Sequence, residues 1–438
     1  MKSRLITILG AGESGVGAAI LAKKLGYYPF VSDSSLIGTV YKDNLVKEGI
    51  EFEEGSHQIE KILESELVIK SPGIPPTAPI VESLKKAGKI LISEIEWAFS
   101  HTDKPIIAIT GSNGKSTTTT LIWHLLKNAG IQAKLTGNIG HSLALAVAQN
   151  DVEVFVTEVS SFQLEDINKF APFISLILNI TPDHLDRYHY DIQEYAATKC
   201  RIFENQKGGS YFLYPDNDKL VCENISALSK DVEKIPLSLD TNSERVLKYE
   251  NHSYFLHNPS LQGNHNAANA LFAIAVSRIF EIPPNNIQKG LDSFKGLPHR
   301  MEFLGKIRGI SFINDSKATN VDSVYYALQA QNSRIIWIAG GVDKGNDYSE
   351  LIPLVRQKVK KLVCLGKNNE PLLHAFGEII PIVEEASSME IAVNLCMEGA
   401  ENGDIILLSP ACASFDLFNN YMHRGEMFRQ EFEKLNPH

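Results

Sequence analysis

Short apolar runs and longer helical patterns alternate along the chain. The runs RLITILG, PIIAIT and RIIWIAG are rich in Ile, Leu and Val, as buried strands are. Helical periodicity follows each run, from Ser14 to Leu25, from Lys115 to Ala129, and in a segment that begins near Tyr348. Strands that alternate with helices are typical of largely parallel sheets covered by helices. The pattern therefore predicts an α/β fold.

The length and the turn signals of the chain predict three domains. A chain of 438 residues that is 44% hydrophobic can bury more than one core. One boundary is expected near Ser93, ahead of the turn HTDKP at 101–105. A second is expected near Leu297, where Gly296 and Pro298 precede the hairpin-like run EFLGKIRGISFIND. The predicted domains span residues 1–93, 94–297 and 298–438.

Charge and cysteine content exclude several classes of function. The 52 acidic residues outnumber the 42 basic ones, and the net charge of −10 gives no general attraction for nucleic acid or for an anionic membrane. The five cysteines include no C-x-x-C pair that would indicate a zinc or redox site. The chain opens on a strand and a glycine loop without a secretory signal pattern, and no segment has the apolar length that spans a bilayer. A soluble, cytoplasmic protein is expected.

A glycine loop near the start predicts a ligand that contains a diphosphate. The sequence GAGESG at 10–15 matches G-x-G-x-x-G between a strand and a helix, where exposed amides bind phosphate oxygens. Asp33 closes the next strand-like run, at the distance typical of a ribose-binding carboxylate. Nothing in the loop separates a dinucleotide from a nucleotide sugar. The irregular segment KSPGIPP at 70–76 follows another strand, so it is either a plain turn or a lining of the same crevice.

A second loop, TGSNGKS at 110–116, has the features of an ATP site. It fails the common pattern G-x-x-x-x-G-K-[ST] because position 109 is Ile. It nevertheless joins a strand to a helix, so that Lys115 can reach the β- and γ-phosphates and the Ser116 hydroxyl can ligate magnesium. Glu158 ends the apolar run VEVFVTE and is expected at the same edge of the sheet, as a metal ligand.

The apolar run that opens LILNITPDHLDRYHY at 176–190 ends in a dense polar cluster. The cluster contains Asn179, Asp183, His184, Asp186 and Arg187. Such a density is unusual for an ordinary turn, although a single histidine in a loop is more often solvated than functional. Magnesium prefers oxygen ligands, but a histidine nitrogen can complete a second metal site.

Eight motifs that occur in a fixed order carry a resemblance to a known family. The motifs are TGSNGKST, EVSSFQLE, NITPDHLDRY, YAATKCRIFEN, GNHNAANA, LPHR, NDSKATN and SPACASFD. Together they resemble the Mur ligase superfamily of peptidoglycan synthesis, and the match covers nearly the whole chain. The resemblance implies a Rossmann-like N-terminal domain for a UDP-sugar, a central P-loop ATPase domain, and a Rossmann-like C-terminal domain that helps bind ATP and an amino acid.

The resemblance also implies a reaction. The motifs NDSKATN and SPACASFD are similar to those of the branch that adds D-glutamate to UDP-N-acetylmuramoyl-L-alanine. ATP would phosphorylate the alanine carboxylate, the amine of D-glutamate would attack the acyl phosphate, and phosphate would leave. Closure of the C-terminal domain would exclude water from the acyl phosphate. The expected partners are these substrates, with no nucleic acid and no membrane, and the chain is expected to act as a monomer.

Metal and catalytic groups follow from the same resemblance. Two magnesium ions are implied, and Lys199 in YAATKCR matches a lysine that carbon dioxide carbamylates. Carbamylation turns a cation into an anion, which makes the position compatible with bound magnesium. The implied metal ligands are Ser116, Glu158, His184 and Lys199 as its carbamate. The catalytic candidates are Lys115, His184, Lys199 and Lys317.

The candidate contacts to the substrates form three sets. Those expected to bind ATP are Gly111, Ser112, Asn113, Gly114, Lys115, Ser116, Thr117, Asn269, Arg300 and Asp315, with Asn266 as a further candidate. Those expected to bind the UDP-substrate are Ser14, Asp33, Ser34, Ser71, Pro72 and Gly73 by position, and Asn138 and Gln163 by resemblance. Those expected to bind D-glutamate are Thr319, Lys344, Ser414 and Tyr421, the last standing where related sequences are expected to have phenylalanine. Asn264 is alternatively expected to cap the alanine-rich helix that follows it.

Three other functions remain open at this stage. A sister amide ligase that adds L-alanine, a diamino acid or a dipeptide, or a folylpolyglutamate synthase, would use the same ATP loop. An NAD-dependent oxidoreductase would explain GAGESG and Asp33 but would leave the second phosphate loop without a role. A binding protein that ATP merely switches between two shapes would need no carbamylated lysine.

Overall fold

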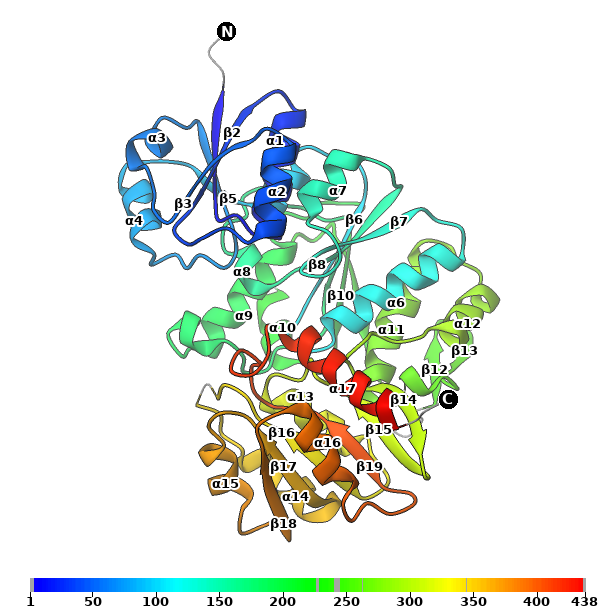
Figure 1. The fold of residues 1–438 in the computed structure, drawn as a ribbon. Helices are drawn as coiled ribbons and strands as arrows, with labels where there is room; N and C mark the ends of the chain where they lie inside the picture. The colour runs from blue at the N-terminus through cyan, green and yellow to red at the C-terminus, as the bar shows by residue number, and fades with distance from the viewer. Residues whose placement is uncertain (1–3, 226–227, 240–244, 262, 344, 436–438) are drawn as a thin grey trace. The chain divides into compact units, whose positions relative to one another are not determined.

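The computed structural model describes residues 4–225, 228–239, 245–261, 263–343 and 345–435. The chain divides into two compact units (Figure 1). Unit 1 comprises Met1–Phe255 and Asn266–Asp292, and unit 2 comprises Leu256–His265 and Ser293–His438. Both units contain parallel sheets with helices, so the predicted α/β class is confirmed.

The first sheet of unit 1 has five parallel strands in the order β3-β2-β1-β4-β5. The chain runs outward from β1 in both directions, so a crevice opens between the carboxyl ends of β1 and β4. The strands are β1 (Leu5–Leu9), β2 (Tyr28–Asp33), β3 (Glu51–Glu54), β4 (Leu67–Lys70) and β5 (Leu91–Ser93). The helices are α1 (Glu13–Lys24), α2 (Thr39–Lys47), α3 (Ile59–Leu63), α4 (Pro79–Lys86) and α5 (Glu94–Phe99).

The second sheet of unit 1 has six parallel strands in the order β11-β10-β9-β6-β8-β7. Its strands are β6 (Ile106–Thr110), β7 (Ala133–Gly137), β8 (Val154–Glu158), β9 (Ile174–Ile177), β10 (Tyr211–Pro215) and β11 (Glu233–Leu237). The hairpin β12 (Val246–Tyr249) and β13 (His252–Phe255) is separate. The helices are α6 (Lys115–Asn128), α7 (Leu143–Gln149), α8 (Ser161–Leu164), η1 (Leu185–Tyr188), α9 (Ile192–Cys200), η2 (Arg201–Phe203), α10 (Lys219–Asn224), α11 (Asn264–Ile279) and α12 (Pro284–Ser293).

Unit 2 is built on a six-stranded sheet in the order β14-β15-β19-β16-β17-β18. Only β14 is antiparallel to its neighbour, as the sequence predicted for the hairpin-like run. The strands are β14 (Glu302–Ile307), β15 (Ile310–Asn314), β16 (Ile335–Ala339), β17 (Val359–Leu365), β18 (Ile382–Ala386) and β19 (Ile405–Leu408). The helices are η4 (Pro259–Leu261), α13 (Val321–Gln329), η5 (Ser349–Leu351), α14 (Ile352–Lys358), α15 (Glu370–Phe376), α16 (Met389–Met397) and α17 (Tyr421–Leu435).

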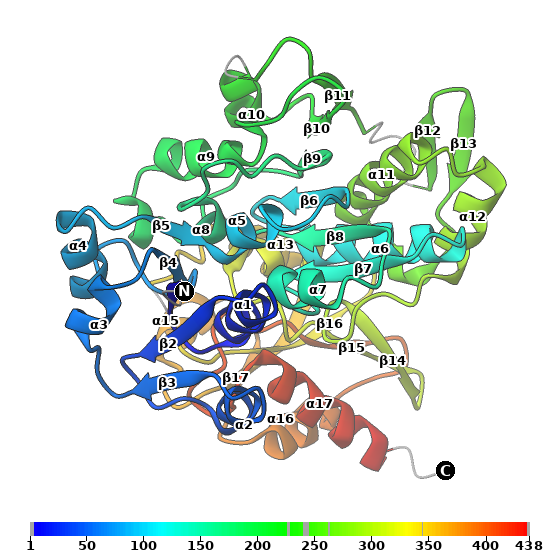
Figure 2. The ribbon, with the colours of Figure 1, turned by 90° about the horizontal axis from the view of Figure 1, so that it is seen from above.

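The two sheets of unit 1 share one hydrophobic core. It includes Ile8 of β1, Ile106 of β6 and Phe155 of β8. Helices α1 and α7 lie side by side where the two parts meet (Figures 1 and 2). Gly17 permits this close contact, since a β-carbon there would lie 1.9 Å from Ser142 Oγ. Both parts belong to the same compact unit.

Two local predictions from the pattern are confirmed and one is wrong. The third helical segment begins with the short turn η5 at Ser349–Leu351 and continues as α14, close to the expected start near Tyr348. Strand β9 ends at Ile177, and Asn179 lies in the loop that follows it, as expected for the start of the polar cluster. Helix α11 already includes Asn264, whose side-chain oxygen accepts no hydrogen bond among the described residues, so the expected capping role is wrong.

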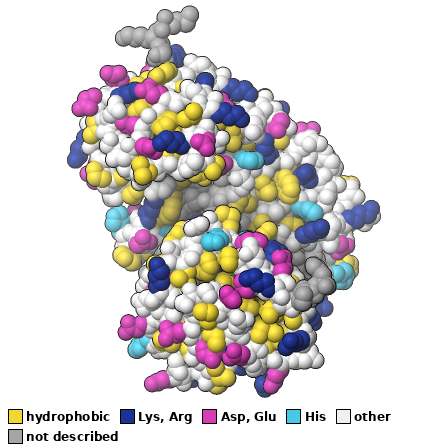
Figure 3. Space-filling model, viewed as in Figure 1, with side chains coloured by type: hydrophobic (Ala, Val, Ile, Leu, Met, Phe, Trp, Pro, Cys, Tyr) yellow, Lys and Arg dark blue, Asp and Glu magenta, His cyan; other side chains and the backbone are white. Residues whose placement is uncertain are grey.

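The lengths of the helices and the distribution of surface charge relate to two predictions, that the chain does not cross a membrane and that it has no general attraction for nucleic acid. Among the residues described, no helix combines the length and apolar character needed to cross a bilayer. Acidic and basic side chains are interspersed over the face shown in Figure 3. The strands of the three sheets fall within 5–93, 106–237 and 302–408, and the three domain limits stay predictions.

Candidate active site

The phosphate loop joins β6 to α6 and is shaped by its glycines. Gly114 precedes the helix in the left-handed region, at φ +85°. A β-carbon at this position would lie 2.4 Å from Oδ1 of Asn269 on α11. The sequence GNHNAANA therefore packs against the loop, which places Asn269 beside the residues expected to bind ATP. Asn269 also donates to Oδ1 of the neighbouring candidate Asn266, at 3.4 Å.

The loop after β9 holds the phosphate loop in place. The amide of Asn113 donates to Asn179 Oδ1 at 2.9 Å, and the amide of Ser112 donates to the Asn179 carbonyl at 2.9 Å. Ser112 Oγ donates to the carbonyl of Thr181 at 2.7 Å. Part of the dense polar cluster seen in the sequence thus has a structural role, since it fixes the conformation of residues 111–113.

Two lysines meet at the carbonyl of Gly111. Lys115 Nζ donates to this oxygen at 2.7 Å, and Lys199 Nζ donates to it at 3.0 Å. Lys199 lies on α9 with only 1% of its surface exposed. Burial, reinforced by the positive charge of Lys115, lowers the pKa of Lys199 well below its usual value, against the opposing charges of Asp183 and Glu158. Burial and a neighbouring cation both favour a neutral amine at Lys199.

The oxygen donors near these lysines fit magnesium. Ser116 is buried in the first turn of α6, and Glu158 ends β8 directly beside Ile109 of β6. The Glu158 carboxylate accepts from Asn138 Nδ2 at 2.8 Å. A hydroxyl and a carboxylate at adjacent strand ends are ligand types that magnesium uses together with phosphate oxygens. Within the described ranges no group of three or more His, Cys, Asp or Glu side chains could hold a metal.

His184 lies in the loop between β9 and η1, in the left-handed conformation at φ 52°. Its side chain is 47% exposed, and Nε2 lies 3.7 Å from Asp183 Oδ2. The imidazole packs edge-on against Phe162, with ring centroids 5.0 Å apart. Next to Phe162, Gln163 is buried and closes a capping box, in which its Oε1 accepts from the amide of Ser160 at 2.9 Å.

The N-terminal candidates gather at the carboxyl ends of β1, β2 and β4. Both carboxylate oxygens of Asp33 accept backbone amides, from Ala11 at 2.8 Å and from Ser35 at 2.9 Å. Ser71 Oγ donates to the carbonyl of Gly10 at 3.3 Å. The remaining candidates of this set are partly or fully exposed, with Ser14 in the first turn of α1, Ser34 in the loop after β2, and Pro72 and Gly73 in the loop after β4.

The candidates of unit 2 surround the end of β15. Asp315 is buried, and its carboxylate accepts from the Met301 amide at 3.1 Å and from Ser409 Oγ at 2.8 Å. Burial raises the pKa of Asp315 to about 6, although the nearby charge of Arg300 opposes this shift. Lys317 Nζ lies 5.6 Å from the centre of the Tyr421 ring.

The remaining D-glutamate candidates differ in exposure. Thr319 is exposed and Ser414 is buried. Lys344 lies outside the described residues. The structure therefore brings together Lys115, Ser116, Asn138, Glu158, Lys199 and Asn269 in unit 1, and Arg300, Asp315, Lys317 and Tyr421 in unit 2.

Arg424 on α17 is an organising residue that the sequence reasoning missed. Its guanidinium is 1% exposed and donates to the carbonyls of Ser316, Gly340 and Cys412 at 2.9, 3.2 and 3.1 Å. These carbonyls follow β15, β16 and β19, so one side chain ties together three loops at the carboxyl edge of the sheet. Burial lowers the pKa of Arg424 to about 10, which still leaves it charged at neutral pH.

Replacing Arg424 by lysine should destabilise unit 2. Lysine keeps the charge but not the planar fork, so at least one buried carbonyl loses its donor, at an expected cost of about 2–4 kcal/mol. Urea unfolding measures the loss. Arg429→Lys on the same helix is the control, because Arg429 is paired with Glu302 and only partly buried, and should cost less than about 1 kcal/mol. Equal stability of the two variants would contradict the role given to Arg424.

Three family models match successive parts of the chain. The MurD-like N-terminal domain of Mur ligases matches residues 4–93, the Mur ligase middle domain matches 109–277, and the Mur ligase glutamate ligase domain matches 299–412. Relatives that are similar along the entire sequence accompany these matches. The chain belongs to the Mur ligase family.

The relatives themselves share one name, UDP-N-acetylmuramoylalanine–D-glutamate ligase. The one from Christiangramia forsetii is 46% identical over 441 residues, covering 98% of this chain and 99% of the relative. The one from Bacteroides fragilis is 44% identical, with the same coverage.

Solved structures with lower identity share the fold. UDP-N-acetylmuramate–alanine ligase from Thermotoga maritima superposes with a TM-score of 0.63 at 17% identity, covering 98% of this chain and 99% of that one. FolC from E. coli, in complex with DHPP and ADP, has a TM-score of 0.60 at 16% identity, covering 78% and 92%. These likenesses support the three-domain Mur ligase architecture that the resemblance implied.

Proposed function

We propose that this protein joins D-glutamate to the L-alanine carboxylate of UDP-N-acetylmuramoyl-L-alanine, with conversion of ATP to ADP and phosphate. The observation that carries the proposal is the 44–46% identity, over nearly the full length, to enzymes named for this reaction. The product is a precursor of peptidoglycan, so the activity would support cell-wall growth and division.

The reaction proceeds in two steps. A carboxylate oxygen of the alanine attacks the γ-phosphorus of ATP, and ADP leaves with the electrons of the broken P–O bond. The amine of D-glutamate then attacks the acyl carbon of the resulting acyl phosphate, an amide forms, and phosphate leaves while the amine loses a proton. The mixed anhydride is needed because an ionised carboxylate is a poor electrophile.

In unit 1, the phosphate loop at 111–117 would bind the ATP phosphates. Lys115 would hold the γ-phosphate, the group that is transferred. Ser116, Glu158 and His184 would hold magnesium, which neutralises phosphate charge when it is bound. The buried amine of Lys199, whose pKa is lowered, supports carbamylation by carbon dioxide, which reacts with a neutral amine. A carbamate there would add an anionic oxygen ligand, and a second magnesium ion is proposed on that basis.

The remaining candidates divide between the substrates. The UDP-substrate would be bound by Ser14, Asp33, Ser34, Ser71, Pro72, Gly73, Asn138 and Gln163. The adenine of ATP would be bound by Asn266 and Asn269. In unit 2, Arg300 and Asp315 would contact the nucleotide, Lys317 the reacting phosphate, and Thr319, Lys344, Ser414 and Tyr421 the D-glutamate. Since one chain supplies a candidate group for every step, we propose that it acts as a monomer, on cytoplasmic precursors.

A coupled assay of phosphate release tests the proposal. Turnover is expected with UDP-N-acetylmuramoyl-L-alanine, D-glutamate, magnesium and ATP together, and omission of any one should abolish it. The controls replace D-glutamate by L-alanine, a diamino acid or a dipeptide, each with its matching acceptor. Turnover only with a diamino acid would assign the chain to a sister activity, and tight NADH binding without ATPase activity would favour the oxidoreductase.

A further inference from the structure

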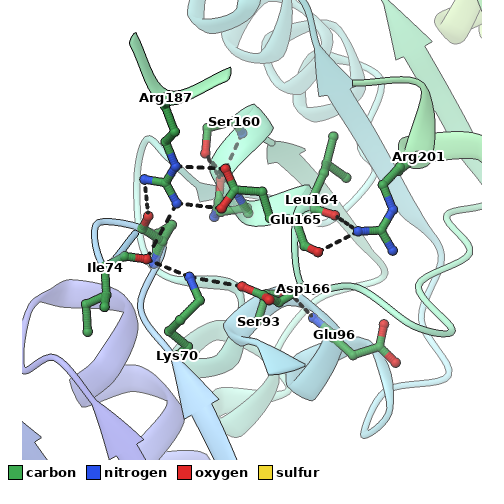
Figure 4. A network of polar contacts seen from close by, with 12 residues as sticks. Lys70, Ile74, Ser93, Glu96, Ser160, Leu164, Glu165, Asp166, Arg187 and Arg201 are labelled. Atoms are coloured by element: carbon green, nitrogen blue, oxygen red, sulfur yellow. Dashed lines mark hydrogen bonds and ion pairs between the residues drawn. The ribbon is translucent and has the colours of Figure 1, made fainter. Parts of the chain in front are cut away.

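A network of ion pairs and hydrogen bonds in unit 1 connects Lys70 and the loop after β4 with Glu165, Asp166 and Arg187 (Figure 4). We call the side chains of Lys70, Glu165, Asp166 and Arg187 the loop clamp. Lys70 ends β4 in the first sheet, whereas the other three belong to the part of the chain built on the second sheet. The clamp therefore joins loops from both sheets within one compact unit.

Lys70 forms the buried half of the clamp. Its side chain is 1% exposed, and Nζ lies 2.9 Å from Asp166 Oδ2 and 2.8 Å from the carbonyl of Ile74. The carbonyl of Asp166 in turn accepts the amide of Ser93 at 2.9 Å. An ion pair this buried holds its partners in a narrow range of positions, because separating them would leave a buried charge without compensation.

Arg187 forms the other half and uses its guanidinium fork on two segments at once. Nε and Nη2 donate to the two carboxylate oxygens of Glu165, the first at 2.8 Å. Nη1 donates to the carbonyl of Pro72 at 3.1 Å, and Nη2 lies 3.5 Å from that of Ile74. These carbonyls belong to residues 71–76, the loop whose Ser71 contacts Gly10 in the first glycine loop. Movement of this loop would change the position of the guanidinium.

The same residue is tied to His184. The amide of Arg187 donates to the His184 carbonyl at 3.0 Å, in the turn that forms η1. The guanidinium carbon lies 4.0 Å from the centre of the Phe162 ring, and the His184 imidazole packs edge-on against the same ring, with centroids 5.0 Å apart. Backbone and side chain of Arg187 therefore both contact groups that determine where His184 points.

We infer that Arg187 is a positioning residue that couples binding at the 71–76 loop to the placement of His184. The inference rests on the proposed function, which gives the loop to the UDP-substrate and His184 to the metal. The geometry then makes nucleotide–metal binding and UDP-substrate binding mutually dependent through one guanidinium. Such coupling is reciprocal, and it typically changes affinity by about 5–150-fold.

Calorimetry on the full chain tests the coupling without turnover. The dissociation constant of UDP-N-acetylmuramoyl-L-alanine is measured with and without Mg·ADP, and the ratio is the coupling factor. In the wild type a factor of at least about five is expected, and in Arg187→Lys a factor close to one, since lysine cannot bridge Glu165 and Pro72 together. A merely structural role would lower the bound fraction in both conditions and leave the ratio unchanged.

Two further variants keep the result interpretable. Arg278→Lys is the matched control, because Arg278 also pairs with a glutamate, Glu250, and with a backbone carbonyl, but touches neither loop. It should keep the wild-type factor. If Arg187→Lys fails to fold, Glu165→Gln weakens the bidentate pair in its place and should lower the factor part of the way.

The outcomes separate this inference from the function on which it rests. A wild type that turns over in the coupled assay but shows the same coupling factor as Arg187→Lys would overturn the inference and leave the ligase function standing. A wild type that never turns over would refute the function. No coupling in the wild type would also overturn the inference, whatever the assay shows.

Discussion

Lys199→Met is expected to lower turnover in the coupled assay by at least about 10²-fold. The substitution preserves most of the side-chain volume at a site that is 1% exposed, so folding should survive. It removes the amine that donates to Gly111 and that we propose carries the carbamate. Because methionine offers no acidic oxygen ligand, added formate or acetate should restore part of the rate by occupying the space of the missing carbamate.

The pH dependence of the wild type gives the second half of this test. Carbon dioxide reacts only with the neutral amine, and burial together with Lys115 lowers the pKa of Lys199. Carbamate occupancy should therefore rise with pH, fall as acid protonates the amine, and persist to lower pH than it would on an exposed lysine. Labelling with ¹³CO₂ and NMR detection measures the occupancy directly. Lys207→Met, at an exposed lysine, is the control and should leave both rate and label unchanged.

A nucleotide-switched binding protein predicts the opposite result for Lys199→Met. In such a protein the variant would still bind its partners and hydrolysis would be incidental, so neither the loss of turnover nor rescue by small carboxylic acids is expected. Full activity of Lys199→Met, together with no ¹³C label on the wild type, would show that the reaction needs no carbamate.

The features that the sequence predicts best are those set by neighbouring residues, namely the opening strands and the loops that follow them. The opening strands and phosphate loops were found because apolar runs that end in glycine and lysine are local signals, and β1, β6 and β16 all lie where the runs predicted them. The polar cluster after β9 was also recognised, but its partners were not. Asn179 bonds the phosphate loop through a contact that spans 66 residues of sequence.

Long-range side-chain partners are what the sequence does not show. Arg424 reads as one charged residue on an amphipathic helix until the sheet places three loop carbonyls around it. Arg187 stood in a recognised polar cluster, yet its partner Pro72 is 115 residues away. Asn138 and Gln163 were expected only as substrate contacts, and the structure adds a bond to Glu158 for one and a capping box for the other.

Lys115→Met should lower the turnover number by about 10²–10³-fold, the usual effect of removing one preorganised donor to a charged transition state. Lys115 Nζ is held by the carbonyls of Gly111 and Ser112, both at 2.7 Å, so its charge is fixed at the mouth of the phosphate loop. Affinity for the UDP-substrate should change little, because six of its eight proposed contacts lie in the part of the chain built on the first sheet. Lys127→Met, in the last turn of the same helix, is the control and should keep full activity.

The same variant also tests whether the two lysines are coupled. The positive charge of Lys115 is one cause of the lowered pKa of Lys199, so its removal should raise that pKa. Less neutral amine would then be present at pH 7, and the carbamate would lose a nearby cation that stabilises it. Both effects act in one direction, so ¹³C-carbamate occupancy should fall in Lys115→Met and recover only at higher pH. Unchanged occupancy in this variant would mean that the two groups, although they share the Gly111 carbonyl, act independently.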